Sequence, residues 1–79
     1  MARLRSLQPG NQNVKVHPSE VDGFHQLAIG DDGRPFLHLT TFGSDSRKSQ
    51  PKSSQSLQLD EGMARQLVAL LRETFPGLD

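Results

Sequence analysis

The side chains best suited to chemistry are three cations in one polar segment. Arg47, Lys48 and Lys52 fall within residues 43–53, where Asp45 is the single anion and no aliphatic or aromatic side chain occurs. Cations and hydroxyl groups are the donors that contact phosphates in nucleic-acid complexes, and a loop can follow a phosphate backbone. The segment therefore suggests a phosphate-binding loop, although a loop that is simply solvated has the same composition. The neutral donors in and beside it are Ser44, Ser46, Ser49, Ser53 and Ser54.

Aromatic side chains recur at every second or fourth position just before this segment. Phe36, His38, Thr40 and Phe42 would share one face of a strand, with leucines at 37 and 39 on the other face. Exposed rings stack bases with about 1–3 kcal/mol for each base. The same rings are suited to packing against a second subunit or to filling the margin of a core. We expect subunit packing ahead of core filling, and both ahead of base stacking.

Catalytic and metal-binding patterns have little support in the sequence. There is no cysteine, which excludes disulfides and thiolate zinc sites, and the three histidines have no ligand spacing. His25 and His38 could lie on neighbouring strands, but no carboxylate or thiol accompanies them. Residues 30–33 (Gly-Asp-Asp-Gly) offer two carboxylates, yet hairpin turns select the same residues. No nucleophile elbow, Walker loop or dinucleotide motif is present, so we expect neither an enzyme nor a cofactor nor a metal site.

Length and charge limit the classes of partner. The 79 residues suffice for one domain, with nine basic and nine acidic residues that leave no net charge to attract nucleic acid. Any nucleic-acid binding must then come from a local patch. A domain of this size buries only about 60% of its unfolded surface, so we expect a homodimer or a bound partner to complete the core. No apolar run is long enough for a membrane span, and the first residues do not form a secretory signal; a cytoplasmic location is the default.

The elements that would position these side chains can be read from turn residues and alternation. Residues 1–13 are expected to form a flexible arm, and residues 14–79 a single β-β-β-β-α domain. An edge strand is expected at residues 14–17, ended by Pro18, because proline cannot donate to a strand ladder. Strands at residues 24–29 and 36–42 flank the Gly-Asp-Asp-Gly turn and predict a hairpin. Residues 54–59 give a fourth strand.

A C-terminal helix follows. Asp60 is a natural N-cap, residues 61–74 carry an apolar stripe at helical spacing, and Pro76-Gly77 ends the pattern. The sequence thus predicts an α+β fold with an antiparallel sheet of three to four strands and one C-terminal amphipathic helix packed on one face. The expected core and dimer residues are Leu37, Leu39, Leu57, Leu59, Met63, Leu67, Leu70 and Leu71.

The order of these elements resembles a known family. The runs Phe36-Leu37-His38-Leu39-Thr40-Thr41-Phe42, Pro51-Lys52 and Ser56-Leu57-Gln58-Leu59-Asp60, followed by the leucines of the helix, are similar to the DNA-binding domain of the positive-cofactor-four transcriptional coactivators. The resemblance covers about residues 24–75. It implies an antiparallel sheet with one helix, dimers that form through helices and sheets, and binding of single-stranded or melted nucleic acid.

Our leading hypothesis is therefore a homodimeric module that binds single-stranded nucleic acid, with a role related to transcription. Lys15 would contribute at the margin, and the expected contact residues are Arg34, Arg47, Lys48, Lys52, Phe36, His38 and Phe42. The alternative is an adaptor of the phage or mobile-element type that docks on a host protein, which the neutral charge and an apolar sheet face would favour.

Overall fold

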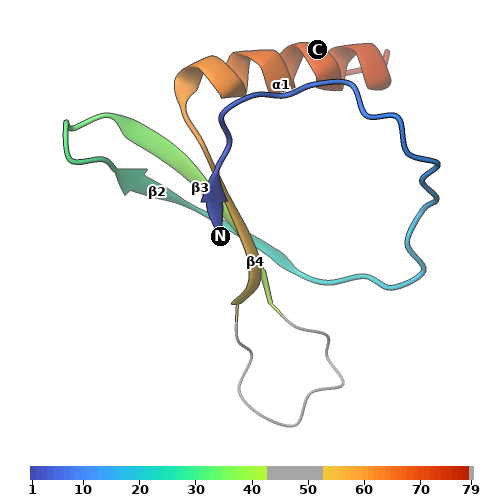
Figure 1. The fold of residues 1–79 in the computed structure, drawn as a ribbon, viewed down its shortest axis with the longest axis horizontal. Helices are drawn as coiled ribbons and strands as arrows, with labels where there is room; N and C mark the ends of the chain where they lie inside the picture. The colour runs from blue at the N-terminus through green and yellow to red at the C-terminus, as the bar shows by residue number, and fades with distance from the viewer. Residues whose placement is uncertain (43–52, 79) are drawn as a thin grey trace, which may run out of the picture.

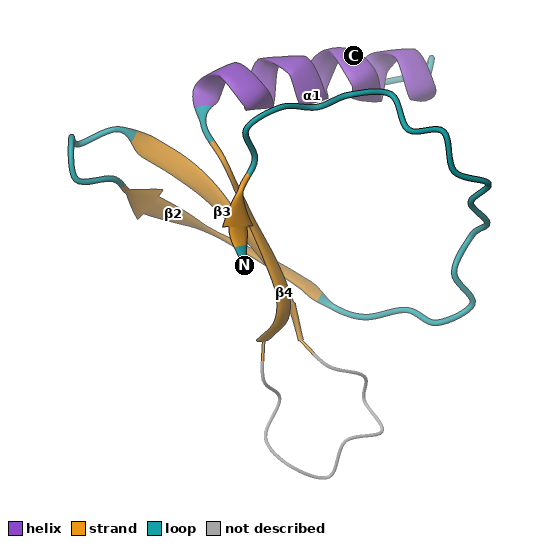
Figure 2. Cartoon of the chain, in the orientation of Figure 1, coloured by secondary structure: helices purple, strands orange, loops and turns teal. Residues whose placement is uncertain are grey.

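The computed structural model describes residues 1–42 and 53–78. Their order is β1 (Ala2–Arg3), β2 (Gly23–Ile29), β3 (Pro35–Phe42), β4 (Ser53–Leu59) and α1 (Glu61–Thr74). The strands form one sheet in the order β1-β4-β3-β2, and the helix leaves the end of β4 (Figures 1 and 2). The expected α+β architecture is confirmed, with one sheet and one C-terminal helix.

The sheet is mixed, not purely antiparallel. β2 and β3 form the expected hairpin, with Leu27 opposite Leu37, and β3 pairs antiparallel with β4, with Leu39 opposite Leu57. β1 instead runs parallel to β4, pairing Ala2 with Leu57. Parallel neighbours require a long connection, and here residues between β1 and β4 include the whole β2–β3 hairpin.

The prediction of a strand at residues 14–17 is wrong. This segment has no regular secondary structure, and Val14 and Val16 are largely exposed. The edge of the sheet beside β4 is taken by β1, and the backbone N–H of Leu4 extends the pairing by donating to the carbonyl of Gln58 over 2.8 Å. Residues 14–17, which end at Pro18, therefore have no unpaired strand edge beside β4 to pair with.

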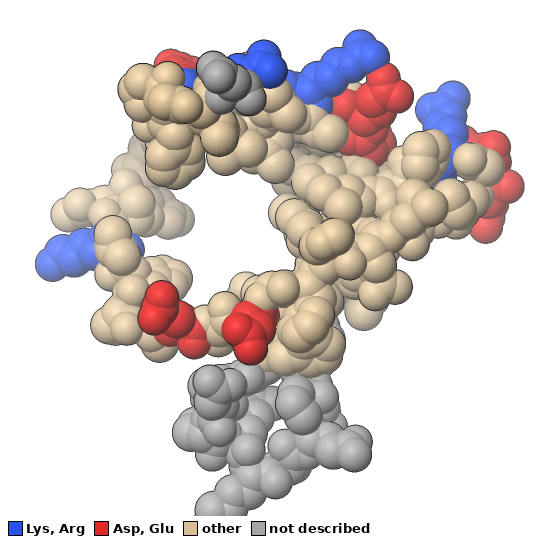
Figure 3. All heavy atoms as spheres, turned by 180° about the vertical axis from the view of Figure 1, so that it is seen from behind, with Lys and Arg blue, Asp and Glu red and all other residues tan. Residues whose placement is uncertain are grey.

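The first part of the N-terminal arm lies against the body of the protein. Leu4 and Leu7 are half-buried, and Nε2 of Gln66 on α1 donates to the Leu7 carbonyl over 3.2 Å. The chain then runs along α1 and returns in a wide curve to β2 (Figure 1). Seen from behind, this curve, α1 and the sheet border an opening through the molecule (Figure 3).

The turn between β2 and β3 has the geometry that its glycines predict. The backbone N–H of Gly33 donates to the Gly30 carbonyl over 2.9 Å, and Gly33 has a φ of 83°. Glycine reaches this left-handed region without the steric cost that a Cβ brings. The hairpin tip is therefore fixed by backbone chemistry, which accounts for the Gly-Asp-Asp-Gly run.

Helix α1 begins and ends close to the expected positions. Asp60 is its N-cap, and the backbone N–H of Phe75 closes the last turn by donating to the Leu71 carbonyl. No residue of α1 is fully buried, and Met63, Ala64 and Leu67 are half-buried. The helix therefore covers only the end of the sheet nearest β4.

The core of one chain is correspondingly thin. Among the described residues Leu59, with 2% exposure, is the one buried apolar side chain, and Thr40 is the one buried polar side chain. The hydroxyl of Thr40 donates to the Gln55 carbonyl over 3.0 Å, which satisfies it. The radius of gyration is 14.9 Å, whereas a compact chain of this length would have about 12 Å.

Candidate nucleic-acid interface

The sheet has two chemically different faces, because successive side chains of a strand point to opposite sides. His38 on β3 lies opposite Gln26 on β2 and opposite Gln58 on β4, so the three polar side chains share a face. We call this the aromatic face; its members are Arg3, Phe24, Gln26, Phe36, His38, Thr40, Phe42 and Gln58. The opposite, leucine face comprises Leu27, Ile29, Leu37, Leu39, Leu57 and Leu59, and the register also places His25, Thr41 and Gln55 on it.

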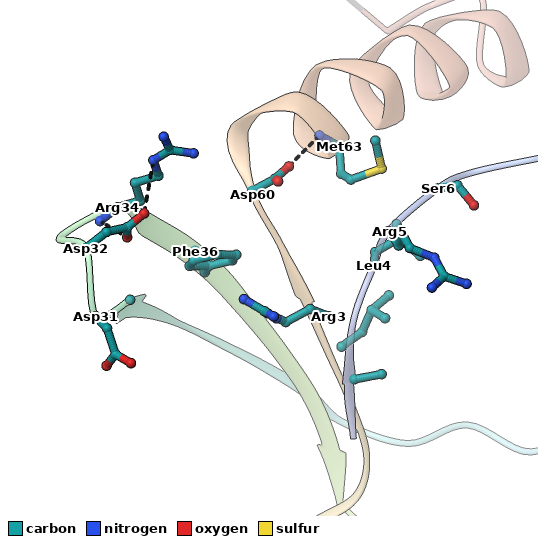
Figure 4. Close-up of a pocket in the computed structure, with 13 residues that line it drawn as sticks. Arg3, Leu4, Arg5, Ser6, Asp31, Asp32, Arg34, Phe36, Asp60 and Met63 are labelled. Atoms are coloured by element: carbon teal, nitrogen blue, oxygen red, sulfur yellow. Dashed lines mark hydrogen bonds and ion pairs between the residues drawn. The ribbon is translucent and has the colours of Figure 1, made fainter.

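A hollow of about 1070 Å³ lies at the end of the sheet, where its lining includes Arg3 and Phe36 of the aromatic face and also Ala2 and Leu57 of the other face. The hairpin tip, the N-terminal arm and the first turn of α1 enclose it (Figure 4). Its apolar lining includes Phe36, Leu4 and Met63. Its charged lining consists of three arginines and three aspartates, which are Arg3, Arg5, Arg34, Asp31, Asp32 and Asp60.

Arg3 and Phe36 meet inside this hollow. The Cζ atom of Arg3 lies 5.9 Å from the centroid of the Phe36 ring, and the two side chains point toward one another from β1 and β3 (Figure 4). A guanidinium at this distance is attracted by the face of an aromatic ring. The contact sets a cation beside a ring, which is a useful pair for holding a planar base and its phosphate.

Two of the aspartates already have partners in the chain. Asp32 accepts from the backbone N–H of Arg34 over 3.1 Å and pairs with Nε of Arg34 over 3.2 Å. Asp60 accepts from the backbone N–H of Met63 over 2.9 Å as the helix cap. These carboxylates are occupied in fixing the hairpin tip and the helix start. Within the described ranges, neither Arg3 nor Arg5 forms an ion pair.

His38 lies further along the aromatic face and has a side-chain partner. Nε2 of Gln58 donates to Nδ1 of His38 over 3.0 Å. A neutral imidazole that accepts at Nδ1 carries its proton on Nε2, so His38 keeps one ring N–H as a donor. Hydrogen-bond donors of this kind, set beside rings, can contact base edges of an unpaired strand.

The structure brings together only some of the site residues expected from the sequence. Arg34 and Phe36 line the same hollow, and His38 follows on the same face. Phe42 lies at the other end of β3, where its ring packs edge-on against Phe24 with centroids 5.0 Å apart. Arg47, Lys48 and Lys52 lie outside the described residues.

Sequence reasoning missed the contribution of the N-terminal arm. Arg3 and Arg5 line the hollow although residues 1–13 were expected to be a flexible tail. A signal was present in Leu4 and Leu7, whose three-residue spacing fits one side of a helical turn or a docked segment. Nothing in the sequence pointed to the parallel pairing with β4 that places these arginines.

Among residues 1–42 and 53–78, no group of three or more histidine or carboxylate side chains is placed to hold a metal ion. None of the helices in that part of the chain is long and apolar enough to span a bilayer. Comparisons of the chain with protein-family models, with curated proteins and with solved structures find no match.

Proposed function

We propose that this protein binds single-stranded or melted nucleic acid on the aromatic face of its sheet, in a role related to transcription. The observation that carries the proposal is the contact between Arg3 and Phe36 in a hollow that Arg5 and Arg34 also line. It supplies a ring for a base and cations for the adjoining phosphates. A partner of this kind also fits the cytoplasmic location expected from the sequence.

The composition of the face supports this choice of ligand. Proteins that bind single strands combine aromatic stacking surfaces with a cationic groove that follows the backbone. Here three phenylalanines share a face with Gln26, His38 and Gln58, whose side chains can donate to and accept from bases. The opposite face also carries His25, Thr41 and Gln55, but leucines occupy most of its paired positions on β3 and β4. A purely structural face would be expected to carry the aliphatic side chains found on that opposite side.

The local distribution of charge supports it as well. The whole chain has no net charge, so attraction to phosphate must be local. Asp32 pairs with Arg34 and Asp60 caps α1, so neither Arg3 nor Arg5 forms an ion pair among the described residues, although Asp31 lines the same hollow and its three arginines are matched by three aspartates. The three cations of residues 47–52 would add to this patch if they approach the same strand.

The test is binding of a fluorescently labelled single-stranded oligonucleotide, followed by anisotropy over a range of salt concentrations. Phe36→Leu removes the ring but keeps an apolar side chain, and it should lose about 1–3 kcal/mol if one base stacks there. Arg5→Gln should weaken binding and reduce the steepness of the salt dependence by about 0.7 in the logarithmic slope. The triple variant Arg47→Gln, Lys48→Gln, Lys52→Gln should reduce the steepness of the salt dependence further.

A matched control is available at the other end of the molecule. Phe75→Leu alters an exposed ring that follows α1 and is remote from the aromatic face, so its affinity should equal that of the natural sequence. Circular dichroism would verify that all variants keep the fold. No binding of any single-stranded DNA or RNA at low salt, or equal losses in Phe36→Leu and Phe75→Leu, would refute the proposal.

A further inference from the structure

The strand β2 forms an open edge of the sheet. It is the last strand in the order β1-β4-β3-β2, and no backbone group of residues 1–42 and 53–78 pairs with its outer side (Figure 1). The opposite edge differs, because β1 and the backbone N–H of Leu4 pair with β4 there. The chain therefore covers part of one edge of its sheet with its own arm and leaves the other edge open.

The register decides which backbone groups of β2 point outward. The N–H of Gly30 donates to the Arg34 carbonyl over 2.8 Å, so these two residues form a hydrogen-bonded pair. Hydrogen-bonded and non-hydrogen-bonded pairs alternate along an antiparallel ladder, and the register of β2 with β3 is continuous. Pro35, which has no N–H, accordingly stands in a non-hydrogen-bonded pair. The residues whose backbone N–H and C=O groups point away from β3 are therefore His25, Leu27 and Ile29.

The features that usually protect an edge strand are missing from β2. Natural sheets protect their edges with very short strands, lysine, proline or a bulge. β2 has seven residues, with no proline, lysine, arginine or carboxylate among them. Its apolar side chains are open as well, since Phe24, Leu27 and Ile29 are between 52% and 66% exposed. An edge of this length and composition is suited to accept a further strand.

We propose that β2 binds an extended segment of another protein, which joins the sheet as a fifth strand. Partner residues that exchange hydrogen bonds with Leu27 and Ile29 would lie directly opposite them and share their face of the sheet. Both side chains belong to the leucine face, so the partner needs apolar side chains at these positions. The intervening position lies opposite Gln26 and suits a polar side chain. The segment therefore alternates, and its apolar residues supply the backbone hydrogen bonds to β2.

Carboxylates at both ends of β2 indicate the charge of the partner. Glu20 and Asp22 precede the strand and Asp31 follows it, and all three are exposed. In the described parts of the chain none of the three forms an ion pair, whereas Asp32 pairs with Arg34. A segment with lysine or arginine at each end would bring opposite charges to these carboxylates, and such complementarity steers association and fixes register.

The same carboxylates disfavour a second copy of β2 as the added strand. In an antiparallel pair of identical strands, the residues before β2 in one copy lie near the residues after β2 in the other. Asp22 would then approach Asp31 of the second copy at both ends of the pair. Like charges opposite each other destabilise a strand pair. A segment of another protein with basic ends therefore fits this edge better than a second copy does.

The test is calorimetric titration with a synthetic peptide, acetyl-Lys-Thr-Ile-Thr-Val-Thr-Ile-Lys-amide, which has the expected alternation and basic ends. Two N-methylated versions separate strand addition from apolar contact, because each methyl group removes the N–H of the residue that carries it. Methylation of the isoleucines and the valine should weaken binding at least about tenfold, since their N–H groups face β2. Methylation of the three threonines should change the affinity by less than about twofold.

A variant of the protein tests the same edge from the other side. The N–H of Leu27 points away from β3, so Leu27→Pro removes an outward donor without removing a bond to β3, and proline is tolerated at such edge positions. Leu27→Thr keeps the N–H and controls for loss of the leucine side chain. We expect Leu27→Pro to bind the peptide at least about fivefold more weakly than Leu27→Thr. Circular dichroism would verify the fold, and the methylated peptides decide the matter if Leu27→Pro unfolds.

The role of charge has its own matched pair. Asp22→Asn should weaken peptide binding and reduce its salt dependence, whereas Glu73→Gln, which removes an exposed carboxylate of α1, should bind like the natural sequence. No binding of the unmodified peptide, equal losses from the two methylated peptides, or a dimer of the natural protein that Leu27→Pro abolishes would overturn the proposal. None of these measurements uses nucleic acid, so a failed single-strand binding assay would leave the result unaffected.

Discussion

Arg3 and Phe36 lie on the same face of the sheet, with the Arg3 Cζ atom 5.9 Å from the ring centroid, although 32 residues separate them in the sequence. The contact crosses from the edge strand β1 over β4 to β3. It therefore ties the start of the chain to the middle of the sheet.

Loss of this contact should weaken the docking of the arm. We expect Arg3→Ala to lower the free energy of unfolding by about 0.5–1 kcal/mol, the range for an exposed cation–π contact. Urea unfolding followed by circular dichroism would measure the change. Lys15→Ala, an exposed change in a segment without regular secondary structure, serves as the control and should leave stability nearly unaltered. Equal effects in both variants would contradict a specific role for Arg3.

Leu59 should be the most sensitive position in the sheet. It is the one buried apolar side chain of the described residues, and truncation of a buried leucine to alanine costs about 2–5 kcal/mol. We expect Leu59→Ala to lower stability by an amount in this range, or to prevent folding. Val16→Ala, at a position 97% exposed, should change stability by less than about 0.5 kcal/mol. A cost at Leu59 no greater than that at Val16 would show that the buried position is wrongly placed.

The cap of α1 offers a third prediction. Oδ1 of Asp60 accepts from the backbone N–H of Met63 over 2.9 Å, and loss of an N-cap acceptor costs about 1 kcal/mol. Asp60→Ala should therefore destabilise the protein by that amount in urea unfolding. Asp60→Asn and Asp60→Ser retain an acceptor and should recover most of the loss. If all three variants were equally stable, the cap would contribute nothing.

The stability of variants at the hairpin tip should depend on how well each residue adopts the backbone conformation of Gly33. Gly33 has a φ of 83°, and a Cβ added there would meet no atom within 4 Å. Any cost of Gly33→Ala must then come from the left-handed backbone, which disfavours residues with a Cβ by about 1–2 kcal/mol. Gly33→Asn should cost less, because asparagine tolerates this conformation. Thermal unfolding of the two variants would reveal the difference, and an alanine variant as stable as the natural protein would exclude strain.

Local patterns predicted most of the secondary structure. The hairpin around residues 30–33, the strand before Asp60 and the capped helix all depend on neighbouring residues, and the structure places them within a residue or so of the expected bounds. Alternation also predicted that leucines and aromatic side chains lie on opposite faces. Each of these features is decided over fewer than fifteen residues, within reach of pattern reasoning.

The long-range arrangement was not predictable in the same way. No local pattern indicates that residues 2–3 pair with β4 and that residues 14–17 do not. The pairing depends on contacts between residues more than fifty positions apart. For the same reason Arg5 was absent from the expected site. The helix was expected to cover the leucine face, but it extends beyond β4 and covers only the end at Leu59. The expectation that the aromatic face packs against a second subunit stays a prediction.

The parallel pairing of β1 with β4 has a consequence for the order of folding during synthesis. Translation makes β1 first, but its partner β4 emerges only after the β2–β3 hairpin is complete. The hairpin, a local structure, can form while the ribosome is still extending the chain. The strand β1 is therefore synthesised first but joins the sheet last. Arg3 contacts Phe36 only after β2, β3 and β4 have paired.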